Sequence, residues 1–313
     1  MSSFSICRSS DAERTPVPTT PPRPRSPTAP TPPARPSLSL TRFRGARSVE
    51  LDGAEVKPRG EEPQPVPPFL RWPAFVEFMN GHWEAGEHLS IVGQTGSGKT
   101  VLETELVPAV REWIVVLGTK RADASLYAPL EAKGFRMVDD LELRQAPGPR
   151  LIYRIPLRGT SLQAEEDQRE RIRRLLVDAY NEPGWCLVLD EVGYLSKDLK
   201  LDRELNRLWR EGRSAGTTVV ALTQRPVNVP RNMWEMATHT IGFRITGRDD
   251  RLTASEYLGD LRGVAFETFA RLDRFEFLYV DAIESVAVRS KVERPARGAR
   301  EAEPAATQQS TMR

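Results

Sequence analysis

The chain has 313 residues, a hydrophobic fraction of 39%, a formal net charge of +2 and two cysteines. This length suits one large α/β domain with tails, and the near-neutral charge gives no global signal for nucleic-acid binding. Two cysteines exclude a disulfide framework, and no run approaches the roughly 18 apolar residues of a membrane-spanning helix. Because its beginning lacks a secretory leader, we expect a cytoplasmic protein.

The two ends of the chain differ in composition from its middle. Residues 1–68 contain 15 of the 26 prolines together with many arginines, so we expect a basic, disordered arm with polyproline II character. This arm either holds DNA or a partner, or it is a solvated tail. Residues 290–313 are rich in Arg, Glu, Ala and Gln and are expected to be disordered too. Residues 69–289 remain as the folded domain.

Apolar runs and helical patterns alternate through this domain. Strands are predicted at residues 88–92, 113–117, 151–155, 185–189, 217–222, 239–245 and 275–280. Helices are predicted at residues 101–111, 126–133, 164–181 and 201–213. Because continuous apolar strands that alternate with helices are typical of parallel sheets, we predict an α/β fold. It should have an open, mainly parallel central sheet with helices on both faces.

A glycine-rich run between the first predicted strand and helix fits the phosphate-binding pattern G-x-x-x-x-G-K-[ST]. Its residues are Gly93, Gln94, Thr95, Gly96, Ser97, Gly98, Lys99 and Thr100. The glycines allow a curled backbone whose N–H groups converge on phosphates, and the helix N-terminus adds partial positive charge. We expect Lys99 to neutralise the β- and γ-phosphates of ATP and the Thr100 hydroxyl to ligate Mg²⁺. The strand before the run and the helix after it argue against a chance turn.

Polar residues that could complete an ATP site follow two later predicted strands, 185–189 and 217–222. The apolar strand 185–189 ends in Asp190 and Glu191, which resembles a Walker B motif. We expect Asp190 to hold Mg²⁺, through water, and Glu191 to orient or deprotonate the attacking water. Because nucleotide binding alone needs no such glutamate, the pair favours hydrolysis. Gln224, at the end of the next strand, is placed to reach the γ-phosphate and its water.

The stretch Leu205–Pro230 resembles the FtsK/HerA superfamily of DNA-pumping ATPases. Members of that superfamily carry a helix ending in Arg-x-x-Gly, a hydrophobic strand and then Thr-Gln-Arg-Pro, here Arg213–Gly216 and Thr223–Pro226. Residues 240–251 are similar to the next strand and helix start of the family. Lys120 lies where the family often has an Asp-Pro-Lys-like turn, but the aspartate and proline are absent, so we assign this lysine no role.

The resemblance covers residues 88–281 and implies a RecA-like P-loop core in a homohexameric ring that moves double-stranded DNA, using ATP and Mg²⁺. It implies that Gln224 is the sensor glutamine and that Arg213 contacts ATP on the neighbouring subunit, with Arg251 as a second candidate. The chain shows no N-terminal membrane anchor and has no room for a winged-helix domain. We therefore expect a motor of a plasmid, phage or other mobile element.

Other features of the sequence are less specific. The candidates for DNA contact are arginines that are also compatible with solvated faces: Arg169, Arg171, Arg173, Arg174, Arg225 and Arg231. The three histidines, His82, His88 and His239, show no metal-ligand spacing. Two alternatives to a translocase stay open. One is a viral genome-packaging ATPase, and the other is a nucleotide-dependent adaptor that docks partners through the proline- and arginine-rich arm.

Overall fold

A computed structural model describes residues 66–293, apart from 121 and 160. Apart from residues 66–68 and 290–293, the predicted arm and tail lie outside the described residues, as does Cys7, so their disorder stays a prediction. The described residues of the arm pair with the last strand, where the Arg289 amide donates to the Pro68 carbonyl at 2.7 Å.

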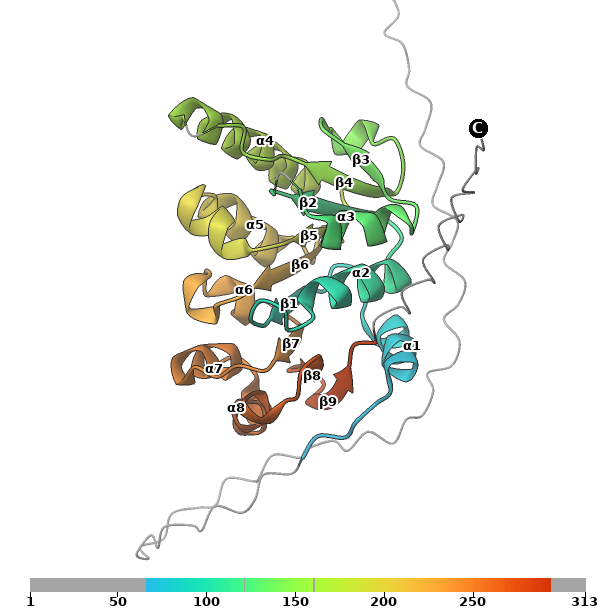
Figure 1. Cartoon of the computed structure of the whole chain (residues 1–313), viewed down its shortest axis with the longest axis vertical. Coiled ribbons are helices and arrows are strands. Elements are labelled where there is room, and N and C mark those ends of the chain that lie inside the picture. Colours follow the sequence, from blue (N-terminus) through green and yellow to red (C-terminus); the bar gives the residue numbers. More distant parts are fainter. Residues whose placement is uncertain (1–65, 121, 160, 294–313) are drawn as a thin grey trace, which may run out of the picture. The chain divides into compact units, whose positions relative to one another are not determined.

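Within residues 66–293, nine strands form a single sheet in the order β3-β4-β2-β5-β6-β1-β7-β8-β9 (Figure 1). The strands are β1 Leu89–Val92, β2 Ile114–Gly118, β3 Arg136–Val138, β4 Arg150–Arg154, β5 Cys186–Leu189, β6 Thr218–Thr223, β7 His239–Phe243, β8 Glu276–Asp281 and β9 Val286–Lys291. The strands from β3 to β7 pair in parallel, whereas β8 and β9 are antiparallel. The predicted α/β fold with a mainly parallel sheet is confirmed.

Helices cover both faces of this sheet, as predicted. They are α1 Trp72–His82, α2 Lys99–Val110, α3 Ala124–Glu131, α4 Leu162–Asn181, α5 Asp202–Glu211, α6 Asn232–Glu235, α7 Arg248–Ser255 and α8 Arg262–Arg271. Figure 1 shows α1, α2 and α3 on one face and α4 to α8 on the other. In the described part of the chain, none of these helices is long and apolar enough to cross a membrane.

Strand β5 illustrates how the core is divided between the two faces. Successive side chains of a strand point to opposite faces. Leu187 and Leu189 accordingly pack into the cluster beneath α4 and α5, whereas Cys186 and Val188 pack into the cluster beneath α2. Because both faces are buried, the strand is apolar throughout. Complete burial raises the pKa of the Cys186 thiol to about 12, which makes it an unreactive core residue.

Several elements were not predicted because their apolar signals are short or interrupted. Helix α1 follows the proline-rich arm and itself begins with Trp72 and Pro73. Strand β3 has three residues, none of them buried, at the sheet edge. Strand β9 forms the opposite edge and pairs with β8 as an antiparallel hairpin. The two strands extend the sheet at its edges, and none of the three elements contributes a residue to the candidate site.

Candidate nucleotide site at the carboxyl edge of the sheet

The P-loop, residues 93–100, connects the carboxyl end of β1 to the first turn of α2. Gly96 and Gly98 have φ values of 78° and 119°, which residues with a Cβ rarely adopt. A Cβ on Gly93 would lie 2.5 Å from the Ser97 hydroxyl oxygen and 2.9 Å from the Cβ of Phe243. The glycines at these three positions are therefore required by the conformation of the loop and by its packing.

Lys99 lies over this loop at the start of α2. Its ammonium donates to the carbonyl oxygens of Gly93 and Gln94. Burial lowers the pKa of Lys99, while the negative charges of Asp190 and Glu191 act against that shift. The structure thus brings the predicted phosphate-binding lysine and the two predicted carboxylates into one electrostatic site.

Asp190 follows β5 and is paired with Lys120, the lysine to which we assigned no role from the sequence. The Lys120 ammonium lies 2.9 Å from Asp190 Oδ2 and 3.1 Å from Asp123 Oδ2. Partial burial opposes its charge, but these two carboxylates raise the pKa of Lys120 above its ordinary value. The sequence did not reveal this residue, because the aspartate of the Asp-Pro-Lys-like turn is missing before Lys120. The aspartate that pairs with Lys120 is Asp123, three residues after it.

Glu191 and Gln224 form the next part of the site. Glu191 has a φ of 61°, an uncommon conformation for a residue other than glycine. Burial, and then the negative charge of Asp190, raise the pKa of Glu191, while a hydrogen bond from Gln224 acts against the shift. The Thr95 hydroxyl donates to Gln224 Oε1 at 2.8 Å. Gln224 therefore connects the P-loop to Glu191.

The order of the strands explains why these residues meet. Strands β2, β5, β6 and β1 are consecutive in the sheet and parallel. Their carboxyl ends lead to Lys120, to Asp190 and Glu191, to Gln224 and to the P-loop. Ligands of open α/β sheets bind at this edge. All predicted site residues except Arg213 thus lie at one edge of the sheet.

The donor set at this edge fits a magnesium ion bound with a nucleotide. Mg²⁺ prefers oxygen ligands and is commonly held by one or two protein oxygens together with substrate phosphates. The Asp190 carboxylate and the half-buried Thr100 hydroxyl are such donors. The Lys120 ammonium beside Asp190 also indicates that this position favours a cation.

Arg213 lies at the opposite, amino edge of the sheet. It follows α5, its side chain is 58% exposed, and its guanidinium is 3.5 Å from Glu87 Oε1, just before β1. Within one chain it does not approach the P-loop, so a role in hydrolysis requires a neighbouring chain and stays a prediction. The second candidate, Arg251, stacks its guanidinium on the Phe266 ring at 4.5 Å.

Glu103 is a residue that sequence reasoning missed. It lies one turn after Lys99 on α2 and is 1% exposed, and neither carboxylate oxygen has a hydrogen-bond partner among the described residues. Burial, and then the nearby charge of Asp190, raise the pKa of Glu103 well above its ordinary value. Its position beside Leu102 and before Leu106, both buried, was the sequence signal that could have indicated a buried carboxyl. The geometry indicates a neutral carboxyl behind the P-loop.

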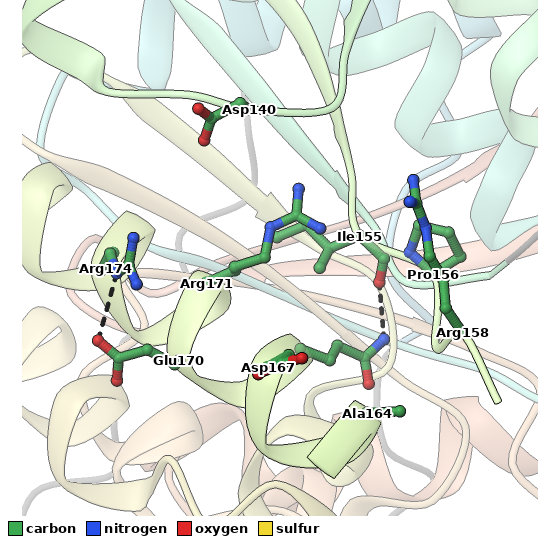
Figure 2. A pocket seen from close by; sticks show the side chains of 10 residues that line it. Asp140, Ile155, Pro156, Arg158, Ala164, Asp167, Glu170, Arg171 and Arg174 are labelled. Atoms are coloured by element: carbon green, nitrogen blue, oxygen red, sulfur yellow. Dashed lines mark hydrogen bonds and ion pairs between the residues drawn. The ribbon is translucent and has the colours of Figure 1, made fainter. Parts of the chain in front are cut away.

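Two arginines of α4, Arg171 and Arg174, border an open pocket of about 480 Å³ between β4 and α4 (Figure 2). Its charged lining residues are Asp140, Arg158, Asp167, Glu170, Arg171 and Arg174. Arg174 and Arg173 both pair with Glu170, at 3.3 and 2.7 Å. Because cations and carboxylates balance, this pocket offers DNA phosphates no excess positive charge.

Arg225 and Arg231 are different from the α4 arginines. They follow β6, at the edge that carries the nucleotide site, and their side chains are 66% and 69% exposed. Their nearest carboxylates, on Asp250 and Glu235, are 3.9 Å away. Of the six arginines considered from the sequence, these two are the better placed for a phosphate backbone.

We predict that Glu103→Gln changes the pH dependence of stability. At pH values between the pKa of Glu103 in the unfolded chain and its raised pKa in the folded protein, the unfolded chain has lost the carboxyl proton and the folded protein keeps it. Rising pH therefore makes folding less favourable in this range. Glutamine cannot ionise. The free energy of unfolding of the variant should therefore increase relative to the wild type from about pH 5 to about pH 8, by at least about 1 kcal/mol.

Urea denaturation at both pH values measures this difference. Glu105→Gln is the matched control, because Glu105 lies on the same helix with its carboxylate paired to Lys133 at 2.7 Å. A difference between Glu103→Gln and the wild type that does not change with pH would show that Glu103 is ionised in the folded protein.

Neither a protein-family model nor a curated protein sequence matches this chain. Solved structures do match it. The genome packaging NTPase B204 of Sulfolobus turreted icosahedral virus 2, in complex with ATP-gammaS, has a TM-score of 0.53 and 17% identity over 67% of this chain and 99% of that one.

Two further structures show the same likeness. B204, the DNA-packaging ATPase of Sulfolobus turreted icosahedral virus, has a TM-score of 0.50 and 15% identity over 67% of this chain and 100% of that one. VirB4 of Thermoanaerobacter pseudethanolicus has a TM-score of 0.51 and 11% identity over 67% and 90%. The chain therefore shares the fold of these three structures, which agrees with the P-loop core that the sequence resemblance implied.

Proposed function

We propose that the chain is an ATP-hydrolysing motor of the FtsK/HerA type that moves double-stranded DNA. The observation that carries the proposal is the convergence of the P-loop, Asp190, Glu191 and Gln224 at consecutive carboxyl ends of one parallel sheet. A solved NTPase with this fold, in complex with ATP-gammaS, supports nucleotide binding.

Each residue of the site has a distinct part in hydrolysis. Lys99 neutralises the β- and γ-phosphates, and the Thr100 hydroxyl and Asp190 would hold Mg²⁺. When bound, that ion neutralises charge that develops on the phosphates. Lys120 contacts Asp190 through Oδ2, at 2.9 Å, so Oδ1 is the oxygen through which Asp190 would hold the ion or its water. Lys120 would then lie beside the phosphates as a further cation.

Glu191 is the residue that orients or deprotonates the attacking water. A general base is most effective when its pKa is close to the working pH, and burial raises the pKa of Glu191 in that direction. Gln224, hydrogen-bonded to Thr95, keeps its amide between Glu191 and the loop that binds the γ-phosphate. This arrangement favours turnover over passive nucleotide binding and so argues against a simple adaptor.

Assembly would complete the site. Arg213 is exposed and lies at the edge opposite its own P-loop, a position from which it can serve only another chain. An arginine supplied in trans accelerates phosphoryl transfer by about 10³ to 10⁵. In a homohexameric ring, each hydrolysis step would then depend on the neighbouring subunit, and Arg225 and Arg231 would be positioned for contact with DNA phosphates.

A viral genome-packaging ATPase is the second candidate function. It is favoured by the two B204 structures, which are described as packaging enzymes and match over two thirds of this chain. A packaging motor would use the same residues and differ in its partner, a procapsid. Copurification with a procapsid would distinguish it from a plasmid or mobile-element translocase.

We predict that Glu191→Gln binds ATP but hydrolyses it at least about 100-fold more slowly, since a general base contributes about 10² to 10⁴ in rate. Lys99→Ala should lose binding or turnover. Asp198→Asn, which removes an exposed carboxylate in the segment after the same strand, is the matched control and should resemble the wild type. Unchanged turnover in Glu191→Gln would remove this residue from the role of base.

We predict that two inactive variants restore activity when they are mixed. Arg213→Ala and Lys99→Ala should each hydrolyse ATP poorly as pure proteins. In a mixed ring, an intact Lys99 on one subunit faces an intact Arg213 on its neighbour, so mixing should recover a fraction of wild-type turnover. If mixtures stay as inactive as the separate variants while both still assemble, Arg213 does not act in trans.

A further inference from the structure

Two histidines and an aspartate from three distant parts of the chain meet at the amino edge of the sheet. His82 ends α1, His239 begins β7 and Asp281 ends β8, directly opposite His239 in the antiparallel pair. His82 Nε2 and His239 Nδ1 lie 3.0 and 3.6 Å from Asp281 Oδ2, and the three atoms all lie within 4.8 Å of one another. We propose that they form a binding site for a divalent transition metal ion of the zinc type.

The distances suit such an ion. Zinc bonds to nitrogen and oxygen are about 2.0–2.2 Å long, so tetrahedral ligands lie about 3.4 Å apart. The two measured separations from Asp281 fall on either side of that value. Imidazole nitrogens with one carboxylate oxygen favour zinc or cobalt over magnesium or calcium. The His82 side chain is 19% exposed, so an ion can reach the cluster from solvent.

Asp281 is held in the orientation that a metal ligand needs. Its Oδ1 accepts the backbone amides of Ile283 and Glu284 at 2.8 and 2.9 Å, which directs Oδ2 toward the histidines. Oδ2 is therefore the oxygen that would face a bound ion.

His239 has a carboxylate behind its ring, as metal-bound histidines usually have. Its Nε2 lies 3.0 Å from Glu87 Oε2. The other ring nitrogen, Nδ1, faces Asp281 Oδ2 and the Tyr279 hydroxyl, at 3.6 and 2.8 Å. A carboxylate behind a ligating imidazole fixes its tautomer and strengthens metal binding.

The ring of His82 is fixed as well. It stacks on Phe78, with ring centroids 4.7 Å apart. Glu87 also contacts Arg213, the candidate trans arginine, through its other oxygen at 3.5 Å. A metal at this site would thus fix the position of His239 and, through it, of the glutamate that Arg213 contacts.

The test is a Co²⁺ titration of the full chain after treatment with a chelator, without nucleotide or Mg²⁺. We expect one Co²⁺ per chain with the visible absorption of tetrahedral coordination, displaced by Zn²⁺. His82→Gln should weaken binding at least tenfold, and Glu87→Gln by about 10- to 100-fold. Glu77→Gln, an exposed change on the same helix, and Asp190→Asn, in the nucleotide site, should bind Co²⁺ as the wild type does.

Two results would overturn the proposal. If folded wild-type protein binds neither ion, the cluster is a hydrogen-bond network only. If Asp190→Asn abolishes binding and His82→Gln does not, the ion occupies the nucleotide site. Should His82→Gln fail to fold, X-ray absorption of the zinc-loaded wild type decides, because the proposed site requires two imidazole ligands on the metal.

Discussion

The parallel pairing of β2, β5, β6 and β1 is the constraint on which the candidate site depends. Parallel strands end at the same edge, so residues that are far apart in the sequence become neighbours there. Lys120, Asp190, Gln224 and the P-loop are brought together in this way. The apolar clusters on both faces hold the strands in register and thereby fix the positions of the polar residues that follow them.

Charge balance explains the electrostatics at this edge. Burial disfavours the charged form of all three residues: it lowers the pKa of Lys99 and raises the pKa of Glu191 and of Glu103. Lys120 is the exception, since its pKa is raised by contact with Asp190 and Asp123. A bound nucleotide and its metal ion would add negative and positive charge beside Asp190. The Lys120 side chain is 55% exposed, so it has room to change its position when the ion binds.

The sequence predicted the elements whose signals are continuous. The apolar run of β5, the glycines of the P-loop and the position of Gln224 after β6 all led to correct placements. Lys120 was not assigned because its role depends on Asp123, a partner that lies downstream of the turn. Glu103 looked like any helical glutamate, since its burial depends on the packing of α2.

The histidine cluster shows a different limit of sequence reasoning. Metal-ligand spacing is a local pattern, but His82, His239 and Asp281 come from a helix and two strands that meet through the antiparallel pairing of β7 with β8. That part of the sheet departs from the parallel order found elsewhere. Pairing of this kind is set by tertiary contacts, which no spacing along the chain reveals.

The most direct test of a DNA motor is ATP hydrolysis by the full chain as a function of protein concentration, with and without linear duplex DNA. Lys99→Ala provides the blank. We expect turnover per chain to rise cooperatively with concentration, because assembly supplies the arginine of the neighbouring chain. Duplex DNA should stimulate turnover, because it is the proposed substrate of the motor. Turnover that is independent of concentration and indifferent to DNA would contradict the proposal of a ring translocase.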